Sequence, residues 1–193
     1  MFNRIKKTVR LGLVLSILTG LLPTMPIAFA IQYQFTNSSI LLSTSKPSTA
    51  ANWTITIENV QAIPADGTIT ITPEATKFTI PADMDFNDLD LNIASSEITL
   101  AATPGSGADS AWGVSITSGT SGSIVLTNND TDTVTAESTI IIEIGTHATQ
   151  GSTGEEQIVS PDKDAAVGTA DIWSVDITSK DDSAVVLLSL IHI

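Results

Sequence analysis

The stretch Asn52–Val60, NWTITIENV, decides the fold class of this chain. Apolar Trp53, Ile55 and Ile57 alternate with polar residues, so in an extended strand the two kinds of side chain point to opposite faces. The β-branched Ile and Thr residues favour the same assignment. Past Ile31, no window of adequate length has the period of an amphipathic helix. The stretch therefore predicts a half-buried β-strand.

The same alternation recurs along the chain, and turn clusters rich in Gly, Asn and Asp separate its occurrences. In IPADGT (63–68), Asp66-Gly67 predicts a tight hairpin in which glycine supplies the positive φ. Roughly nine closely spaced strands favour an all-β, antiparallel β-sandwich over a βαβ fold. The further expected strands are GTITIT (67–72), DLDLNI (88–93), EITLAA (97–102), AWGVSIT (111–117), GSIVLT (122–127), STIIIEIGT (138–146) and IWSVDIT (172–178), with QYQFT (32–36) and SILLSTS (39–45) as edge elements.

The stretches ANWTITIENVQAIPADGTITIT (51–72), FTIPADMDF (78–86) and STIIIEIGTHATQGSTGEEQI (138–158) carry a resemblance. They resemble the immunoglobulin-like β-sandwich modules of large exported surface proteins from uncultured bacteria, in which an I-P-x-x-G-x-I-x-I turn and an x-I-x-I-G-T-x-A-T strand recur. The resemblance covers most of residues 31–186. It implies a surface, adhesion-type or cell-envelope module, and it carries over no catalytic or binding residue.

The first thirty residues have the order of a secretory signal peptide. A basic start (1–10) precedes an apolar stretch (11–22), two prolines and the small-x-small triplet Ala28-Phe29-Ala30. The apolar stretch is also shorter than the about 20 residues that span a bilayer. We predict that residues 1–30 are removed and that the protein is secreted or stands on the cell surface.

The charge balance of the remaining chain is strongly acidic. Residues 31–193 keep four lysines and no arginine against 21 Asp and Glu, a net charge of −17. Such a surface repels phosphate backbones, so nucleic acid is excluded as a partner. The chain also lacks cysteine, which excludes disulfides and thiolate chemistry and favours a microbial envelope or extracellular protein.

The chain ends on the apolar run AVVLLSLIHI (184–193), about half as long as a membrane span requires. Its last part, LSLIHI (188–193), is what the codons CTG TCT CTT ATA CAC ATC encode, and that string is the transposon end used to fragment DNA for sequencing. We therefore predict that residues 188–193 are adapter sequence read as protein. The β-sandwich domain, residues 31–187, is then truncated, and we expect the protein to continue into further modules, a linker or a wall anchor.

The stretch PADMDFNDLDL (81–91) holds the densest cluster of carboxylates. Hard oxygen ligands at this density suit Ca²⁺, which takes six to eight of them. The stretch is no EF-hand, because Asp88 stands where the loop needs Gly and Ala94 where it needs Glu. The alternative is a polar turn at 85–87 with Asp88 and Asp90 on the solvent face of a strand. The candidate calcium ligands are Asp83, Asp85, Asn87, Asp88 and Asp90.

Parts for catalysis are scarce. His147 is the one histidine outside the C-terminal run, and no G-x-S-x-G elbow is present. Glu155 and Glu156 are adjacent, so an extended chain points them to opposite sides, which makes a poor acid/base pair. We predict that the chain is not an enzyme and that it needs no cofactor other than the calcium considered above.

The sequence therefore predicts a non-enzymatic structural or adhesive module of an exported cell-surface protein, with a surface protein or a glycan as partner. Contact with a membrane would come only through the leader or a missing anchor. Two alternatives remain: a carbohydrate-binding module of a longer secreted enzyme, and a calcium-dependent surface-layer subunit. The first needs exposed tryptophans, whereas alternation with Val and Ile predicts that the three tryptophans lie in the core, Trp53, Trp112 and Trp173.

Overall fold

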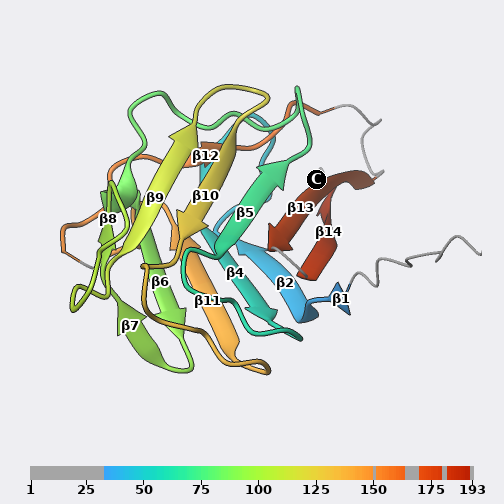
Figure 1. Cartoon of the computed structure of the whole chain (residues 1–193). Helices are drawn as coiled ribbons and strands as arrows, with labels where there is room; N and C mark the ends of the chain where they lie inside the picture. Colours follow the sequence, from blue (N-terminus) through green and yellow to red (C-terminus); the bar gives the residue numbers. More distant parts are fainter. Residues whose placement is uncertain (1–32, 150, 164–169, 180–181, 192–193) are drawn as a thin grey trace, which may run out of the picture. The chain divides into compact units, whose positions relative to one another are not determined.

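The computed structural model describes residues 33–149, 151–163, 170–179 and 182–191 (Figure 1). The chain divides into two compact units, 1–31 and 32–193, and the described residues all belong to the second. The predicted leader, residues 1–30, lies outside them. Within the described ranges, no helix is long and apolar enough to cross a membrane, and a 3-10 turn, η1 (Phe86–Asp88), is the one helical element.

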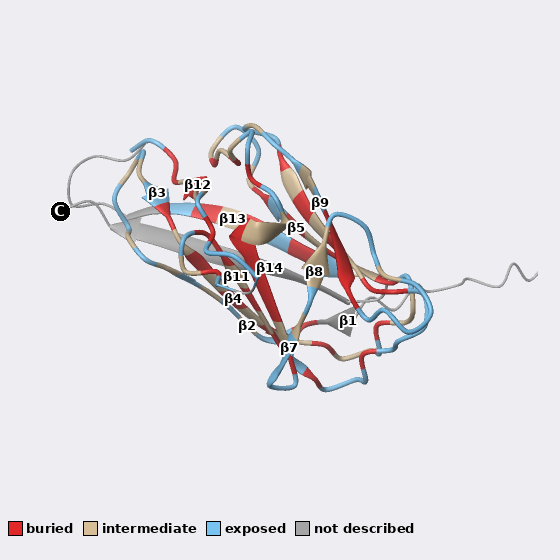
Figure 2. Ribbon diagram, turned by 90° about the vertical axis from the view of Figure 1, so that its left-hand side faces the viewer, coloured by how far each residue is buried: buried red, intermediate tan, exposed pale blue. Residues whose placement is uncertain are grey.

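Two β-sheets face each other across the core, as Figures 1 and 2 show. The alternation of apolar and polar residues explains this arrangement, because each sheet turns one apolar face inward. In spatial order, the seven-stranded sheet contains β1 (Tyr33–Gln34), β14 (Asp182–Ile191), β13 (Ala170–Ser179), β5 (Thr68–Pro73), β10 (Ser123–Thr127), β9 (Trp112–Thr117) and β8 (Leu100–Ala101). The five-stranded sheet contains β2 (Thr36–Leu42), β4 (Trp53–Glu58), β11 (Thr139–Ile144), β6 (Leu89–Ile93) and β7 (Ser96–Ile98), and β12 (Ile158–Val159) pairs with β3 (Ala50–Ala51).

The pairing is antiparallel throughout the described strands, except between β1 and β14 and between β8 and β9. The chain crosses from one sheet to the other between β4 and β5, and again between β10 and β11. Such crossing connections are typical of immunoglobulin-like sandwiches. The predicted fold class, an antiparallel immunoglobulin-like β-sandwich, is confirmed.

The predicted hairpin at Asp66-Gly67 is wrong. The strands that flank it, β4 and β5, lie in different sheets, so the turn connects the two layers. Asp66, not Gly67, has the positive φ, 57°. Glycine is needed at position 67 because a Cβ atom there would lie 2.7 Å from Ile63 Cγ2 and from the Pro64 carbonyl oxygen. Position 67 requires glycine because neighbouring atoms leave no room for a Cβ atom. This crowding cannot be recognised from the sequence alone.

One further expectation, a strand, is wrong. The stretch EITLAA does not form one strand, because β7 and β8 belong to different sheets and the chain passes between them at Thr99. The last strand, β14, includes Leu188–Ile191 and pairs with β13 along its length, so the terminal run has a partner. The adapter origin of residues 188–193 and the domain limits stay predictions, and His192 and Ile193 lie outside the described residues.

The core consists of the inward side chains of both sheets. Figure 2 shows in red the buried residues along the strands of the two sheets. Isoleucines dominate it, in keeping with their preference for pleated, buried surfaces. The predicted burial of the tryptophans is confirmed, since Trp53, Trp112 and Trp173 are 0%, 2% and 3% exposed. Phe78 lies between two of them, 5.2 Å from Trp53 and 6.4 Å from Trp173 between ring centroids, edge-on to both. One aromatic side chain thus joins β4 of one sheet to β13 of the other.

Candidate functional site

The predicted calcium stretch forms a capped 3-10 turn followed by a strand. Asp85 caps η1, because its Oδ1 accepts a hydrogen bond from the Asn87 backbone N–H at 2.7 Å. In return, Asp88 Oδ2 accepts from the Asp85 backbone N–H at 2.9 Å, which completes a capping box. The expected polar turn at 85–87 is therefore present, and its carboxylates are already engaged with backbone groups.

Asp88 also fixes a segment distant in the sequence. Its Oδ1 accepts hydrogen bonds from the backbone N–H groups of Glu155 and Glu156, at 2.6 and 2.8 Å. These residues end the segment that follows β11, residues 145–157, which we call the β11–β12 loop. Asp88 is only 4% exposed, and a buried carboxylate is stable only where such donors surround it. Its role here is to fix the loop.

Asp90, two residues further along the chain in β6, also accepts a backbone hydrogen bond from the β11–β12 loop. Its Oδ2 accepts from the Thr149 backbone N–H at 2.7 Å, and the residue is 4% exposed. The expectation that Asp88 and Asp90 lie on a solvent face is wrong. Both do point away from the core side of β6, but the β11–β12 loop covers them.

The structure brings most of the predicted calcium ligands to one hollow of about 320 Å³, the acidic hollow, and leaves Asp90 outside it. The β11–β12 loop supplies the opposite wall with Glu155 and Glu156, which sequence reasoning set aside. No signal in the sequence predicts the contact between these two segments, because they are more than sixty residues apart. The acidic hollow is lined by Asp83, Asp85, Asn87, Asp88, Ser152, Thr153, Glu155 and Glu156.

As a metal centre, the acidic hollow is incomplete. In the part of the chain that the structure describes, no group of three or more His, Cys, Asp or Glu residues is placed to hold a metal ion together. The oxygens of Asp88 already accept three backbone N–H groups. A calcium ion would depend on the exposed carboxylates of Asp83, Asp85 and Glu155. Calcium binding at these residues stays a prediction.

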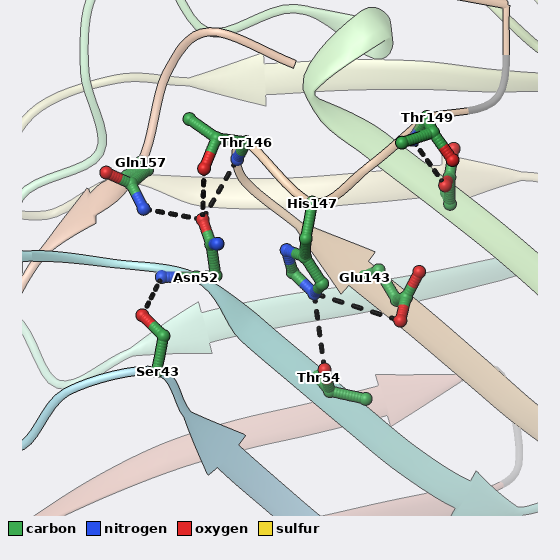
Figure 3. A network of polar contacts seen from close by, with 9 residues as sticks. Ser43, Asn52, Thr54, Glu143, Thr146, His147, Thr149 and Gln157 are labelled. Atoms are coloured by element: carbon green, nitrogen blue, oxygen red, sulfur yellow. Dashed lines mark hydrogen bonds and ion pairs between the residues drawn. The ribbon is translucent and has the colours of Figure 1, made fainter. Parts of the chain in front are cut away.

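His147, the one histidine outside the C-terminal run, lies over the outer side of the five-stranded sheet (Figure 3). Its Nε2 lies 3.2 Å from Thr54 Oγ1 and 3.8 Å from Glu143 Oε1, while its Nδ1 is enclosed without a hydrogen-bond partner. In a nucleophile–base–acid arrangement, the carboxylate holds the ring nitrogen that does not face the nucleophile. Here both neighbours meet the same nitrogen, so these three residues do not form a catalytic triad.

Asn52, the residue just before β4, completes the attachment of the β11–β12 loop (Figure 3). Its Oδ1 accepts from the Thr146 backbone N–H at 2.9 Å, from Thr146 Oγ1 at 3.1 Å and from Gln157 Nε2 at 2.5 Å. A Cβ atom on Gly145 would lie 2.3 Å from the same oxygen. Three polar side chains thus accept backbone hydrogen bonds from this loop: Asn52 just before β4, Asp88 in η1 and Asp90 in β6.

Comparisons with known proteins give distant likenesses. No protein-family model matches the chain, and no curated protein does. The collagen-binding domain from a Staphylococcus aureus adhesin is 11% identical with a TM-score of 0.40, over 82% of this chain and 99% of that domain. BcpA, the major pilin subunit of Bacillus cereus, is 13% identical with a TM-score of 0.37, over 74% of this chain and 35% of the pilin. At these TM-scores neither likeness carries an argument about function, and the expected source in uncultured bacteria stays a prediction.

Proposed function

We propose that this chain is a non-enzymatic structural or adhesive module of an exported cell-surface protein. The observation that carries the proposal is that the enclosed polar side chains of the chain form hydrogen bonds to the backbone of loops. Asp88, Asp90 and Asn52 accept hydrogen bonds from the β11–β12 loop. Asn59, fully buried, donates to the Gln61 and Thr135 carbonyls and accepts from the Ser138 N–H. Side chains that could serve a reaction instead fix loops on the sandwich, as a scaffold requires.

Two sequence features support an exported setting. The leader pattern at residues 1–30 is typical of secretion. The net charge of −17 in residues 31–193 favours solubility in water and disfavours association with anionic polymers. The partner class is an external protein or a glycan, met by loops held rigid on the sheets. Rigid loops lower the entropy cost of binding.

Surface labelling tests the proposal. Cells that express the whole gene are stained with an antibody to the chain before and after permeabilisation, with a cytosolic protein as control. We expect full labelling of intact cells, whereas signal that appears only after permeabilisation contradicts a surface location. The exported chain is then immobilised and exposed to collagen, to other matrix proteins and to neutral glycans. Recovery of any probe in a chemically altered form contradicts a non-enzymatic role.

The carbohydrate-binding alternative loses its tryptophan platform, since all three tryptophans are buried. The calcium-dependent surface-layer alternative rests on the acidic hollow, and its test is described in the Discussion.

A further inference from the structure

The outer face of the seven-stranded sheet is unusual for so acidic a chain. Along β13, β5, β10 and β9, most of the residues that alternate with the buried core positions are Thr or Ser. The register places Thr178, Thr70, Val125 and Ser115 side by side in one row across the four strands. We call this surface the hydroxyl face: Thr68, Thr70, Thr72, Ser115, Thr117, Ser123, Val125, Thr127, Ser174 and Thr178.

Charge separates this face from the rest of the molecule. Among the outward residues of these four strands, Asp176 is the single charged one, and it lies within the face beside Thr72. Glu74 borders the face and accepts a hydrogen bond from the Ser174 N–H. The five-stranded sheet differs, because its outward residues include Glu58, Glu143 and Glu97.

We propose that the hydroxyl face is the surface on which a second copy of this chain docks, face to face, about a twofold axis. Residues 31–193 carry a net charge of −17, so two copies repel one another over most of their surfaces. A nearly uncharged sheet face is where they approach at the lowest electrostatic cost, and a twofold arrangement brings each face against its equal. Sheets stack at about 10 Å through side chains of this size.

An exposed apolar residue also favours this surface as the interface between two copies. Ile172 on β13 is 62% exposed and alternates with Ser174 and Asp176, so it lies on the outward side of that strand. The other large exposed apolar residue in the described chain, Leu41, is on β2 of the opposite sheet. Burial of Ile172 in a dimer would contribute hydrophobic free energy that the monomer does not gain.

The size of the hydroxyl face sets the expected affinity of the dimer. Four strands at about 4.8 Å and six residues at about 3.3 Å give a patch of about 400 Å², half of the roughly 800 Å² per partner in a standard interface. The dimer should therefore be weak and reversible. Such weak contacts act when copies are concentrated side by side, and the inference does not depend on which ligand the proposed module binds.

Sedimentation equilibrium of the exported chain tests the inference over a range of protein and salt concentrations. We expect a reversible monomer–dimer equilibrium that shifts toward dimer as NaCl rises from about 0.05 to about 0.5 M, because salt screens the repulsion between copies. Thr70→Asp, at the centre of the hydroxyl face, should weaken the dimer by at least about tenfold, since it puts like charges across the interface. Ile172→Asp should act in the same direction.

Matched controls come from the other sheet. Thr56 on β4 is half-buried and outward like Thr70, and Leu41 is exposed like Ile172. Thr56→Asp and Leu41→Asp should leave the dimer unchanged, and circular dichroism confirms that all four variants are folded. A monomer at every protein and salt concentration overturns the inference, as does an equal effect of Thr56→Asp and Thr70→Asp. A monomer that binds insoluble neutral polysaccharide and loses that binding in Thr70→Asp also overturns it, by assigning the face to another occupant.

Discussion

At the scale of single residues, the acidic side chains near β6 show how burial changes the role of a carboxylate. Asp88 and Asp90 have the alternation of solvent-facing strand residues, yet a loop from beyond β11 covers them and donates its N–H groups to them. Alternation correctly predicts the side of the strand on which each residue lies. It cannot predict what covers that side, because the covering segment follows more than fifty residues later in the sequence.

Asp88→Ala tests this structural role. The substitution leaves the N–H groups of Asp85, Glu155 and Glu156 without their acceptor in a partly buried site. An unsatisfied group that stays buried costs about 1–3 kcal/mol, and we expect the free energy of unfolding, measured by denaturant titration, to fall by about that amount. Protease cleavage within the β11–β12 loop should also accelerate.

The matched control is Asp83→Ala, which changes an exposed residue of the same acidic hollow. It should alter stability by less than about 0.5 kcal/mol. Equal effects of the two substitutions would mean that Asp88 does not hold the loop.

Gly67 gives a second test at this scale. A Cβ atom there would overlap Ile63 and the Pro64 carbonyl, so Gly67→Ala should destabilise the fold by about 1–3 kcal/mol. Ser121→Ala, in the exposed turn between β9 and β10, serves as control and should have little effect. A neutral Gly67→Ala in thermal unfolding would show that the turn has room for a side chain.

At the scale of elements, the period of two predicted most of the longer strands, because the inward face of each sheet must be apolar. It did not predict β14, whose sequence is a largely apolar run. What alternation could not supply was the partner of each strand. It joined β7 to β8 across Thr99, although they pair in different sheets, and it read the connection between β4 and β5 as a hairpin. Sheet membership depends on contacts between strands distant in the sequence, and single strands do not encode it.

Phe78 is an element-scale feature that alternation also missed, since it lies in no strand. It packs edge-on against Trp53 of β4 and Trp173 of β13 and is 1% exposed. Phe78→Ala should cost about 3–5 kcal/mol by leaving a cavity between the sheets. Near-ultraviolet circular dichroism should lose intensity, because both indole rings lose their neighbour. Phe86→Ala, only partly buried, should cost clearly less, and an equal loss would contradict the joining role of Phe78.

At the scale of the whole molecule, charge is the property that sequence composition predicts best. With four lysines against 21 acids in residues 31–193, self-repulsion destabilises the folded chain at low ionic strength. Any salt should therefore raise the melting temperature by screening. A specific calcium site must be distinguished from this general effect, because both predict stabilisation by CaCl₂.

A comparison of CaCl₂ with MgCl₂ at equal ionic strength makes that distinction. Both oxygens of Asp88 accept backbone N–H groups, so the ligands left to a cation are the exposed carboxylates around the acidic hollow. An exposed, incomplete ligand set binds Ca²⁺ weakly, in the range of about 10⁻⁴–10⁻³ M. We expect the extra rise in melting temperature with CaCl₂ to appear at about millimolar concentration and to vanish in an Asp83→Asn/Glu155→Gln variant. Identical melting curves in the two salts would remove the calcium hypothesis and, with it, the calcium-dependent surface-layer alternative, while the sandwich and its loop attachments would stand unchanged.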